Sequence, residues 1–150
     1  MTRILGLDAG ERRIGVAISD PDASFALPLH SIIVDGHELS AIEAYVRDES
    51  IEAIVIGLPL SMSGESSAQT ERARAFASKV EERLGLPVHL WDERLSTQEA
   101  LRHAGGGEKR RSGRRSRGRQ TPQADTDAIA ASIILQAYLD SLRFGSPERL

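Results

Sequence analysis

The N-terminal part of the chain contains two short segments whose apolar residues follow a β-strand pattern. Residues 3–9 are mostly apolar, and within residues 12–19 the side chains of Ile14, Val16 and Ile18 alternate with small ones. A period of two is typical of strands with two distinct faces. Because only residues 9–11 separate the two segments, the pattern predicts a β-hairpin.

Strands and helices then follow one another along the chain. A third strand is predicted over 27–34, where Asp-Gly at 35–36 ends it, and an amphipathic helix over 38–49. The almost wholly apolar run 51–58 is typical of a strand covered on both faces. The apolar stripe from Ala73 to Leu84 predicts a second helix, with Gly85 as its stop.

The C-terminal third is less regular. Residues 87–91 indicate a short strand, 96–104 a brief helix and 125–142 a long helix. The Gly- and Arg-rich stretch 105–121 has no periodicity and is predicted to be a flexible loop.

This order of elements predicts one α/β domain with a mixed five-stranded sheet and flanking helices. A chain of 150 residues is about one domain long. We expect the domain to cover 1–142, including the loop at 105–121, and to be followed by a tail at 143–150.

The distribution of charge points to a polyanionic partner. The formal net charge is only −3, but residues 109–119 carry 7 basic groups and no acidic one, which leaves 12 basic against 22 acidic groups elsewhere. Guanidinium groups bind phosphate in a bidentate manner, so this density favours contact with a nucleic-acid backbone over a merely solubilising loop. The candidate contacts are Arg110, Arg111, Arg114 and Arg115.

Several classes of protein are disfavoured by composition. The absence of cysteine excludes a disulfide framework, a thiolate metal site and a cysteine nucleophile. No apolar run has the length of a membrane span, and the N-terminus lacks the pattern of a signal peptide. We therefore expect a cytoplasmic protein with no membrane partner.

Acidic residues stand at the edges of three predicted elements. Asp8 ends the first strand, Glu93 follows the last strand, and Asp125 and Asp127 open the final helix. Each alone has a structural explanation: a turn former, a solvated charge cluster, and helix capping. If Asp8, Glu93 and Asp127 converge, they could hold Mg²⁺, which prefers oxygen ligands and can activate water against a phosphodiester. With four scattered histidines and no cysteine, zinc is disfavoured.

The segment after the strand at 51–58 is a second candidate for phosphate contact. It is rich in Gly and Ser, but no Gly-Lys-Ser/Thr follows, so it is not a Walker motif. Its backbone N–H groups and hydroxyls could line the path of a nucleic-acid strand, with Ser61, Ser63 and Gly64 as candidates. An ordinary loop in which Ser66 or Ser67 caps the next helix explains the pattern equally well.

Four segments together resemble one protein family. They are RILGLDAGERRIGVAISD at 3–20, IVIGLPLSMSG at 54–64, WDERLST at 91–97 and DAIAASIILQAYL at 127–139. In this order, and over nearly the whole chain, they are similar to the motifs of the YqgF (RuvX-like) proteins. The resemblance implies an RNase H-like fold of the Holliday-junction-resolvase type. It also implies that Asp8, Glu93 and Asp127 are the catalytic, metal-binding acids.

The sequence departs from this family pattern at three places. Ala9 stands where relatives often have an aromatic residue, and Ser96 where Thr is common. The loop at 105–121 is longer and richer in Arg than expected. The difference in the loop concerns how the substrate is held rather than what is cleaved, whereas Ala9 should open space beside Asp8 without removing a ligand.

Members of the family are described as nucleases that mature the 5′ end of pre-16S rRNA, and some as junction resolvases. The sequence therefore predicts a hydrolase that cuts structured RNA with Mg²⁺ or Mn²⁺, grips phosphate with Arg94, and acts as a monomer or weak homodimer. The alternatives are a resolvase acting on branched DNA and a non-catalytic nucleic-acid-binding factor. An actin-like ATPase, which also carries Asp-x-Gly after a strand, needs two such domains and is disfavoured by length.

Overall fold

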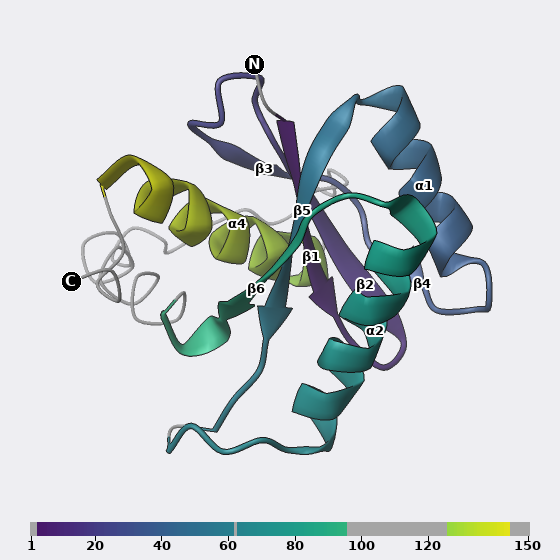
Figure 1. Ribbon diagram of the computed structural model, residues 1–150, viewed down its shortest axis with the longest axis vertical. Helices are drawn as coiled ribbons and strands as arrows, with labels where there is room; N and C mark the ends of the chain where they lie inside the picture. Colours follow the sequence, from purple (N-terminus) through teal and green to yellow (C-terminus); the bar gives the residue numbers. More distant parts are fainter. Residues whose placement is uncertain (1–2, 62, 96–125, 145–150) are drawn as a thin grey trace, which may run out of the picture.

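The computed structural model describes residues 3–61, 63–95 and 126–144, and within them a mixed sheet lies between helices (Figure 1). The strands run along the chain as β1 (Arg3–Ala9), β2 (Arg13–Ser19), β3 (Ala26–Pro28), β4 (Ile32–Ile33), β5 (Ile51–Leu58) and β6 (Val88–Asp92). The helices are α1 (Glu38–Asp48), α2 (Ala68–Leu84) and α4 (Thr126–Phe144).

The sheet has the order β3-β2-β1-β5-β6, and β4 also pairs with β2. β2 is antiparallel to β1, β3 and β4, whereas β1–β5 and β5–β6 are parallel. The predicted mixed α/β sheet is therefore confirmed. The hairpin is confirmed as well, because Ala9 pairs with Ile14 and the Gly10 N–H donates to the Arg13 carbonyl at 2.9 Å.

The prediction of five strands is wrong in one respect: the segment 27–34 forms two short strands instead of one, so the sheet has six strands. Both short strands pair with β2, β3 near its end and β4 near its start. Pro28 closes β3, and proline has no N–H to donate to a strand ladder. The regular pairing stops there and resumes at Ile32.

Alternation along the strands gives the sheet two different faces. Leu5, Leu7 and Ile54 point to the face covered by α1 and α2, where they pack with Ile42 and Val80 of those helices. The other face is covered by α4 (Figure 1), which packs Ala131, Ile134, Leu135 and Leu139 against Ile4, Ala17 and Val55. Gly6 and Asp8 alternate with Leu5 and Leu7 along β1 and therefore belong to this second face.

The ends of α2 are those that the sequence suggests. Ser67 is the N-cap: its side chain accepts from the Thr70 N–H, and the Thr70 side chain accepts from the Ser67 N–H. Gly85 ends the helix in the left-handed region, with φ of 68°. Of the two explanations for the preceding loop, helix capping is therefore present, at Ser67.

The last helix differs slightly from its predicted bounds. α4 runs through Phe144, two residues past the predicted boundary at 142, and Ile129 on its outer side is 45% exposed. Asp125, the predicted helix at 96–104, the loop at 105–121 and residues 145–150 lie outside the described residues. No helix in the described ranges is both long and apolar enough to cross a membrane.

Candidate active site

Asp8, Glu93 and Asp127 come from three elements that meet on the α4 side of the sheet. Asp8 lies near the carboxyl end of β1 and Glu93 directly follows β6. β1, β5 and β6 are parallel, so these two residues lie at the same edge of the sheet. Asp127 is in the first turn of α4. The predicted acids therefore share one region, although 85 residues separate Asp8 from Glu93 in sequence.

Two glycines allow this close arrangement. A Cβ atom at Gly15, the β2 residue paired with Asp8, would lie only 1.9 Å from the Asp127 carbonyl oxygen. A Cβ atom at Gly57 would lie 2.6 Å from Glu93 Oε2 and 2.6 Å from Ile134 Cδ1. A side chain at Gly15 would collide with the α4 backbone and displace the helix, whereas one at Gly57 would push aside the Glu93 and Ile134 side chains. Sequence inspection did not single out these glycines.

The acids are electrostatically coupled. Burial raises the pKa of Asp8; a hydrogen bond from Glu93 lowers it, and the charge of Asp127 raises it. Burial, followed by the charge of Asp8, raises the pKa of Glu93 to about 7. The hydrogen bond between the two side chains lowers the pKa of Asp8 and raises that of Glu93, so it favours the state in which Glu93 carries the shared proton. The charged forms of Asp8 and Glu93 are therefore less favourable in this site than they are in water.

The donor chemistry of this cluster fits a divalent cation. Asp and Glu supply the hard oxygen ligands that Mg²⁺ and Mn²⁺ prefer. A cation would stabilise the charged forms of Asp8 and Glu93, which burial and the proximity of other acids disfavour. Within the described ranges, no group of three or more His, Asp or Glu side chains is arranged so that it could hold a metal ion. Mg²⁺ is commonly held by only one or two carboxylates, with water completing its shell.

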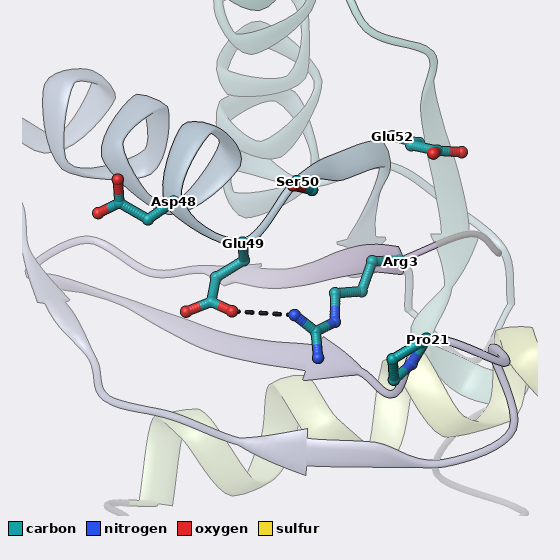
Figure 2. Close-up of a pocket in the computed structure, with 6 residues that line it drawn as sticks. All are labelled: Arg3, Pro21, Asp48, Glu49, Ser50 and Glu52. Carbon is teal, nitrogen blue, oxygen red and sulfur yellow. Dashed lines mark hydrogen bonds and ion pairs between the residues drawn. The ribbon is translucent and has the colours of Figure 1, made fainter.

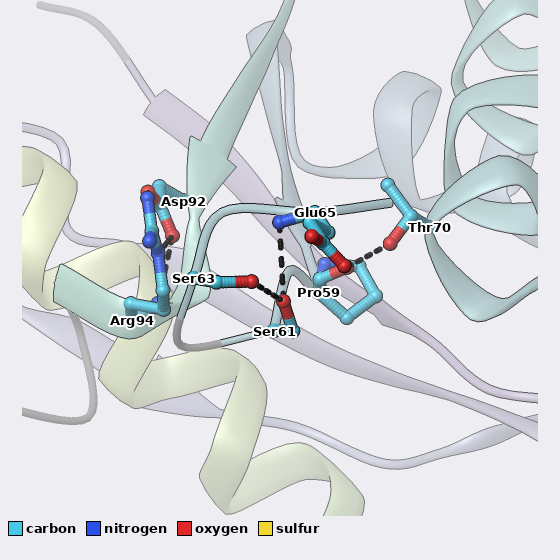
Figure 3. A network of polar contacts seen from close by, with 7 residues as sticks. All are labelled: Pro59, Ser61, Ser63, Glu65, Thr70, Asp92 and Arg94. Carbon is cyan, nitrogen blue, oxygen red and sulfur yellow. Dashed lines mark hydrogen bonds and ion pairs between the residues drawn. The ribbon is translucent and has the colours of Figure 1, made fainter. Parts of the chain in front are cut away.

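Arg94, predicted to contact phosphate, is held by Asp92 (Figure 3). Its Nη2 donates to Asp92 Oδ2 at 2.6 Å and its Nε donates to Oδ1 at 3.0 Å. This interaction lowers the pKa of Asp92. A Cβ atom built at Gly64 would lie 3.5 Å from Nη1 of Arg94, so the guanidinium stands beside the loop before α2. The Asp92–Arg94 pair was not predicted from the sequence.

The predicted loop residues form a compact turn (Figure 3). The Ser61 and Ser63 hydroxyls lie 2.9 Å apart, and Ser61 Oγ also accepts from the Glu65 N–H at 3.1 Å. Gly64 has a φ of 89°, a conformation that favours glycine. Buried Thr70 donates to the Pro59 carbonyl and so ties the loop to α2, a contact that the sequence did not reveal.

The structure thus brings Arg94 close to Gly64, which shares a compact loop with Ser61 and Ser63. Arg110, Arg111, Arg114 and Arg115 lie outside the described residues. Their role as phosphate contacts stays a prediction.

A separate pocket of about 270 Å³ lies at the opposite ends of β1 and β5 (Figure 2). Arg3 and Glu49 form an ion pair in its wall at 3.0 Å. Because Arg3 and Asp8 are at opposite ends of β1, this pocket does not belong to the carboxylate site.

Comparison with known proteins agrees with this architecture. The family model described as "RuvX: Holliday junction resolvase" matches residues 2–141. A protein of Koribacter versatilis named "Putative pre-16S rRNA nuclease" is 40% identical, over 92% of this chain and 86% of that protein. A protein of the same name from Caldanaerobacter subterraneus is also 40% identical, over 93% of this chain and 96% of that protein.

Solved structures show the same fold at lower identity. The chain superimposes on RuvC of T. thermophilus, solved in complex with a Holliday junction substrate, with a TM-score of 0.62 and 16% identity. The match covers 97% of this chain and 98% of that chain. The fold is therefore RNase H-like, as expected, and from the sequence matches over nearly its whole length we conclude that this chain belongs to the RuvX family.

Proposed function

We propose that this protein is a divalent-metal-dependent nuclease that cuts structured RNA at the 5′ end of pre-16S rRNA. The observation that carries the proposal is the meeting of Asp8, Glu93 and Asp127 on one face of an RNase H-like sheet. The names of the relatives support the choice of substrate. Such an RNA would place the protein in the cytoplasm.

In this proposal the three acids position a Mg²⁺ or Mn²⁺ ion. When bound, the cation supplies Lewis-acid stabilisation of the scissile phosphate and activates water. Asp8 and Glu93 contribute the carboxylates that already share a hydrogen bond, and Asp127 contributes negative charge from the start of α4. Since burial and Asp8 raise the pKa of Glu93 to about 7, we expect cation binding to strengthen as pH rises through neutrality.

We assign the binding of phosphates next to the scissile one to Arg94 and to the loop beside it. Asp92 fixes the orientation of the Arg94 guanidinium, which leaves it aimed along the loop that contains Ser61, Ser63 and Gly64. Hydroxyl and backbone N–H groups of such a loop are suitable donors to phosphate oxygens. We assign longer-range, salt-dependent attraction to Arg110, Arg111, Arg114 and Arg115.

The decisive experiment offers two substrates to the purified protein: a 5′-extended 16S precursor and a four-way DNA junction. Each is incubated with Mg²⁺, with Mn²⁺ and with EDTA, and the products are mapped at nucleotide resolution. We expect metal-dependent cuts at the 5′ end of the precursor. Absence of any cleavage, together with retained binding, would instead favour a non-catalytic binding factor.

A Holliday junction resolvase is the second candidate, favoured by the family description and by the RuvC fold. Resolution requires two symmetric cuts, so a resolvase should act as a dimer. Light scattering with and without junction DNA tests this requirement. Paired symmetric cuts in the junction, with an untouched RNA precursor, would replace the RNA proposal.

A further inference from the structure

Three aromatic rings gather where β6 meets α4. The rings of His89 and Tyr138 are stacked, with centroids 5.6 Å apart and planes 25° apart. Trp91 meets the edge of Tyr138, with centroids 5.8 Å apart and planes 84° apart. His89 and Trp91 come from β6, and Tyr138 comes from α4. We call these three residues the aromatic cluster.

The aromatic cluster lies on the same face as the carboxylates. Successive side chains of a strand point to opposite faces, so His89 and Trp91 share a face of β6. Glu93 directly follows β6, and its side chain lies on this face as well, because a Cβ atom at Gly57 of β5 would meet both Glu93 and Ile134 of α4. The rings and the carboxylate therefore form one line along the edge of the sheet, because β6 is the last strand in the sheet order.

The aromatic cluster is not fully buried, unlike an aromatic group in the interior of a protein. His89 is exposed, and Trp91 and Tyr138 are only partly buried. The Trp91 Nε1 atom is itself buried and has no hydrogen-bond partner among the described residues. Trp91 and Tyr138 also pack against the hydrophobic cluster under α4, so His89 is the ring of the aromatic cluster that is open to solvent. Aromatic residues are scarce in this chain, with one Trp, two Tyr and three Phe.

We propose that the aromatic cluster binds an unpaired nucleobase next to the scissile phosphate, by stacking. This inference rests on the proposed nuclease function, which it deepens by making the substrate single-stranded beside the cut. Unpaired bases stack on aromatic side chains in sequence-tolerant recognition of single strands. The exposed His89 ring, backed by Tyr138, offers such a surface in line with Glu93.

The chain provides its own probe for this contact. Trp91 is its single tryptophan, so intrinsic fluorescence reports on the aromatic cluster alone. Asp8→Asn protein in EDTA is titrated with a short single-stranded oligoribonucleotide and with an abasic strand that has the same number of phosphates. We expect saturable quenching by the base-bearing strand and little quenching by the abasic strand. Equal quenching by both strands would overturn the proposal.

Substitution of His89 tests the stacking surface without disturbing the core. His89→Ala should weaken binding of the base-bearing strand roughly fivefold, as measured by anisotropy of a labelled oligonucleotide, and leave abasic binding unchanged. His89→Tyr should restore the affinity, and because tyrosine carries no positive charge this assigns the effect to the ring. Phe25→Ala is the control, since Phe25 is 64% exposed beside β3 at the other edge of the sheet. If His89→Ala binds like the Phe25 control, the proposal is wrong.

These readouts are independent of catalysis. Base-dependent quenching in a protein that cuts no substrate would contradict the nuclease proposal and leave the stacking site standing. Cleavage of the RNA precursor without base-dependent quenching would contradict the stacking site and leave the nuclease proposal standing.

Discussion

The two faces of the sheet differ at particular positions, because the α4 face combines apolar residues such as Ile4 and Val55 with glycines at points of close approach. Toward α1 and α2 the strands present large side chains such as Leu5, Leu7 and Ile54, all fully buried. Toward α4 the same strands present Gly15 and Gly57, where an added Cβ would collide with the helix or with Glu93. Large side chains fill the space under α1 and α2, whereas glycines on the other face allow α4 and Glu93 to lie close to the strands.

Under the proposed function, one face of the sheet provides stability and the other carries the chemistry. Burying aliphatic side chains removes apolar surface from water, which stabilises the fold. The α4 face gathers acids at the carboxyl ends of the parallel strands, where burial and then the charge of Asp8 raise the pKa of Glu93 to about 7. Functional sites commonly contain such destabilising arrangements. The following four predictions test whether the two roles can be separated.

The largest effect is expected at the carboxylates. Asp8→Asn should reduce metal-dependent cleavage at least about a thousandfold, because loss of a ligand removes several kcal/mol of transition-state stabilisation. Circular dichroism and the unfolding midpoint should stay close to those of the native protein. Asp48→Asn, an exposed acid at the end of α1, is the matched control and should cleave normally. Full activity of Asp8→Asn would remove Asp8 from the site.

The next effect concerns the large-residue face. Ile54→Ala should lower the free energy of unfolding by about 2–5 kcal/mol, since Ile54 is completely buried and a cavity would remain. Urea titration followed by circular dichroism measures this loss. Cleavage per folded molecule should be almost unchanged at low temperature. Leu27→Ala, at a site 55% exposed, is the control with little expected loss. A large drop in the rate of the folded Ile54→Ala protein would show that the faces are not independent.

A smaller effect on stability, with a marked effect on activity, is expected at Gly15. The methyl group of Gly15→Ala would lie 1.9 Å from the Asp127 carbonyl oxygen, so the first turn of α4 must move. We expect about 1–3 kcal/mol of destabilisation from overpacking, and roughly tenfold or greater loss of cleavage from a misplaced acid. Gly6→Ala is the comparison, because its methyl group meets the Leu135 side chain, nearer the middle of the helix. Equal loss of activity in both variants would argue against a specific role for Asp127.

The smallest effect is a change in pH dependence. Burial and Asp8 raise the pKa of Glu93 from 4.5 to about 7, so the folded state favours the protonated acid. The stability from this group is fully present below about pH 4.5 and is lost as pH rises through about 7. Without metal, Glu93→Gln should therefore be more stable than the native protein at pH 8, by on the order of 1 kcal/mol after solvent screening.

The pH prediction is checked by urea denaturation in EDTA between pH 4.5 and 8. The difference between the two proteins should disappear toward the acidic end. Mg²⁺ should stabilise the native protein at pH 8 more than the Gln variant. A native protein that is the more stable of the two at pH 8 without metal would contradict the assigned pKa shift.

Short-range features of this protein could be predicted from the sequence. The β1–β2 hairpin follows from alternation and a short connection, and the ends of α2 follow from Ser67 and Gly85. The order of strands and helices was sufficient to predict a mixed sheet. These features depend on residues close together in the chain, whose propensities act before any tertiary contact forms. The resemblance of four motifs named the candidate acids, and their catalytic roles stay predictions.

Tertiary structure alone decided how these parts meet. Pairing with β2 divides one predicted strand into two at Pro28, the Arg94 guanidinium lies beside Gly64, and Thr70 ties the loop to α2. Gly15 and Gly57 acquire their importance only because α4, more than 65 residues away in sequence, packs on them. The shared hydrogen bond and the raised pKa of Glu93 arise from the same long-range packing. Sequence patterns specify which face a residue occupies, whereas distance and burial depend on what the rest of the chain places against that face.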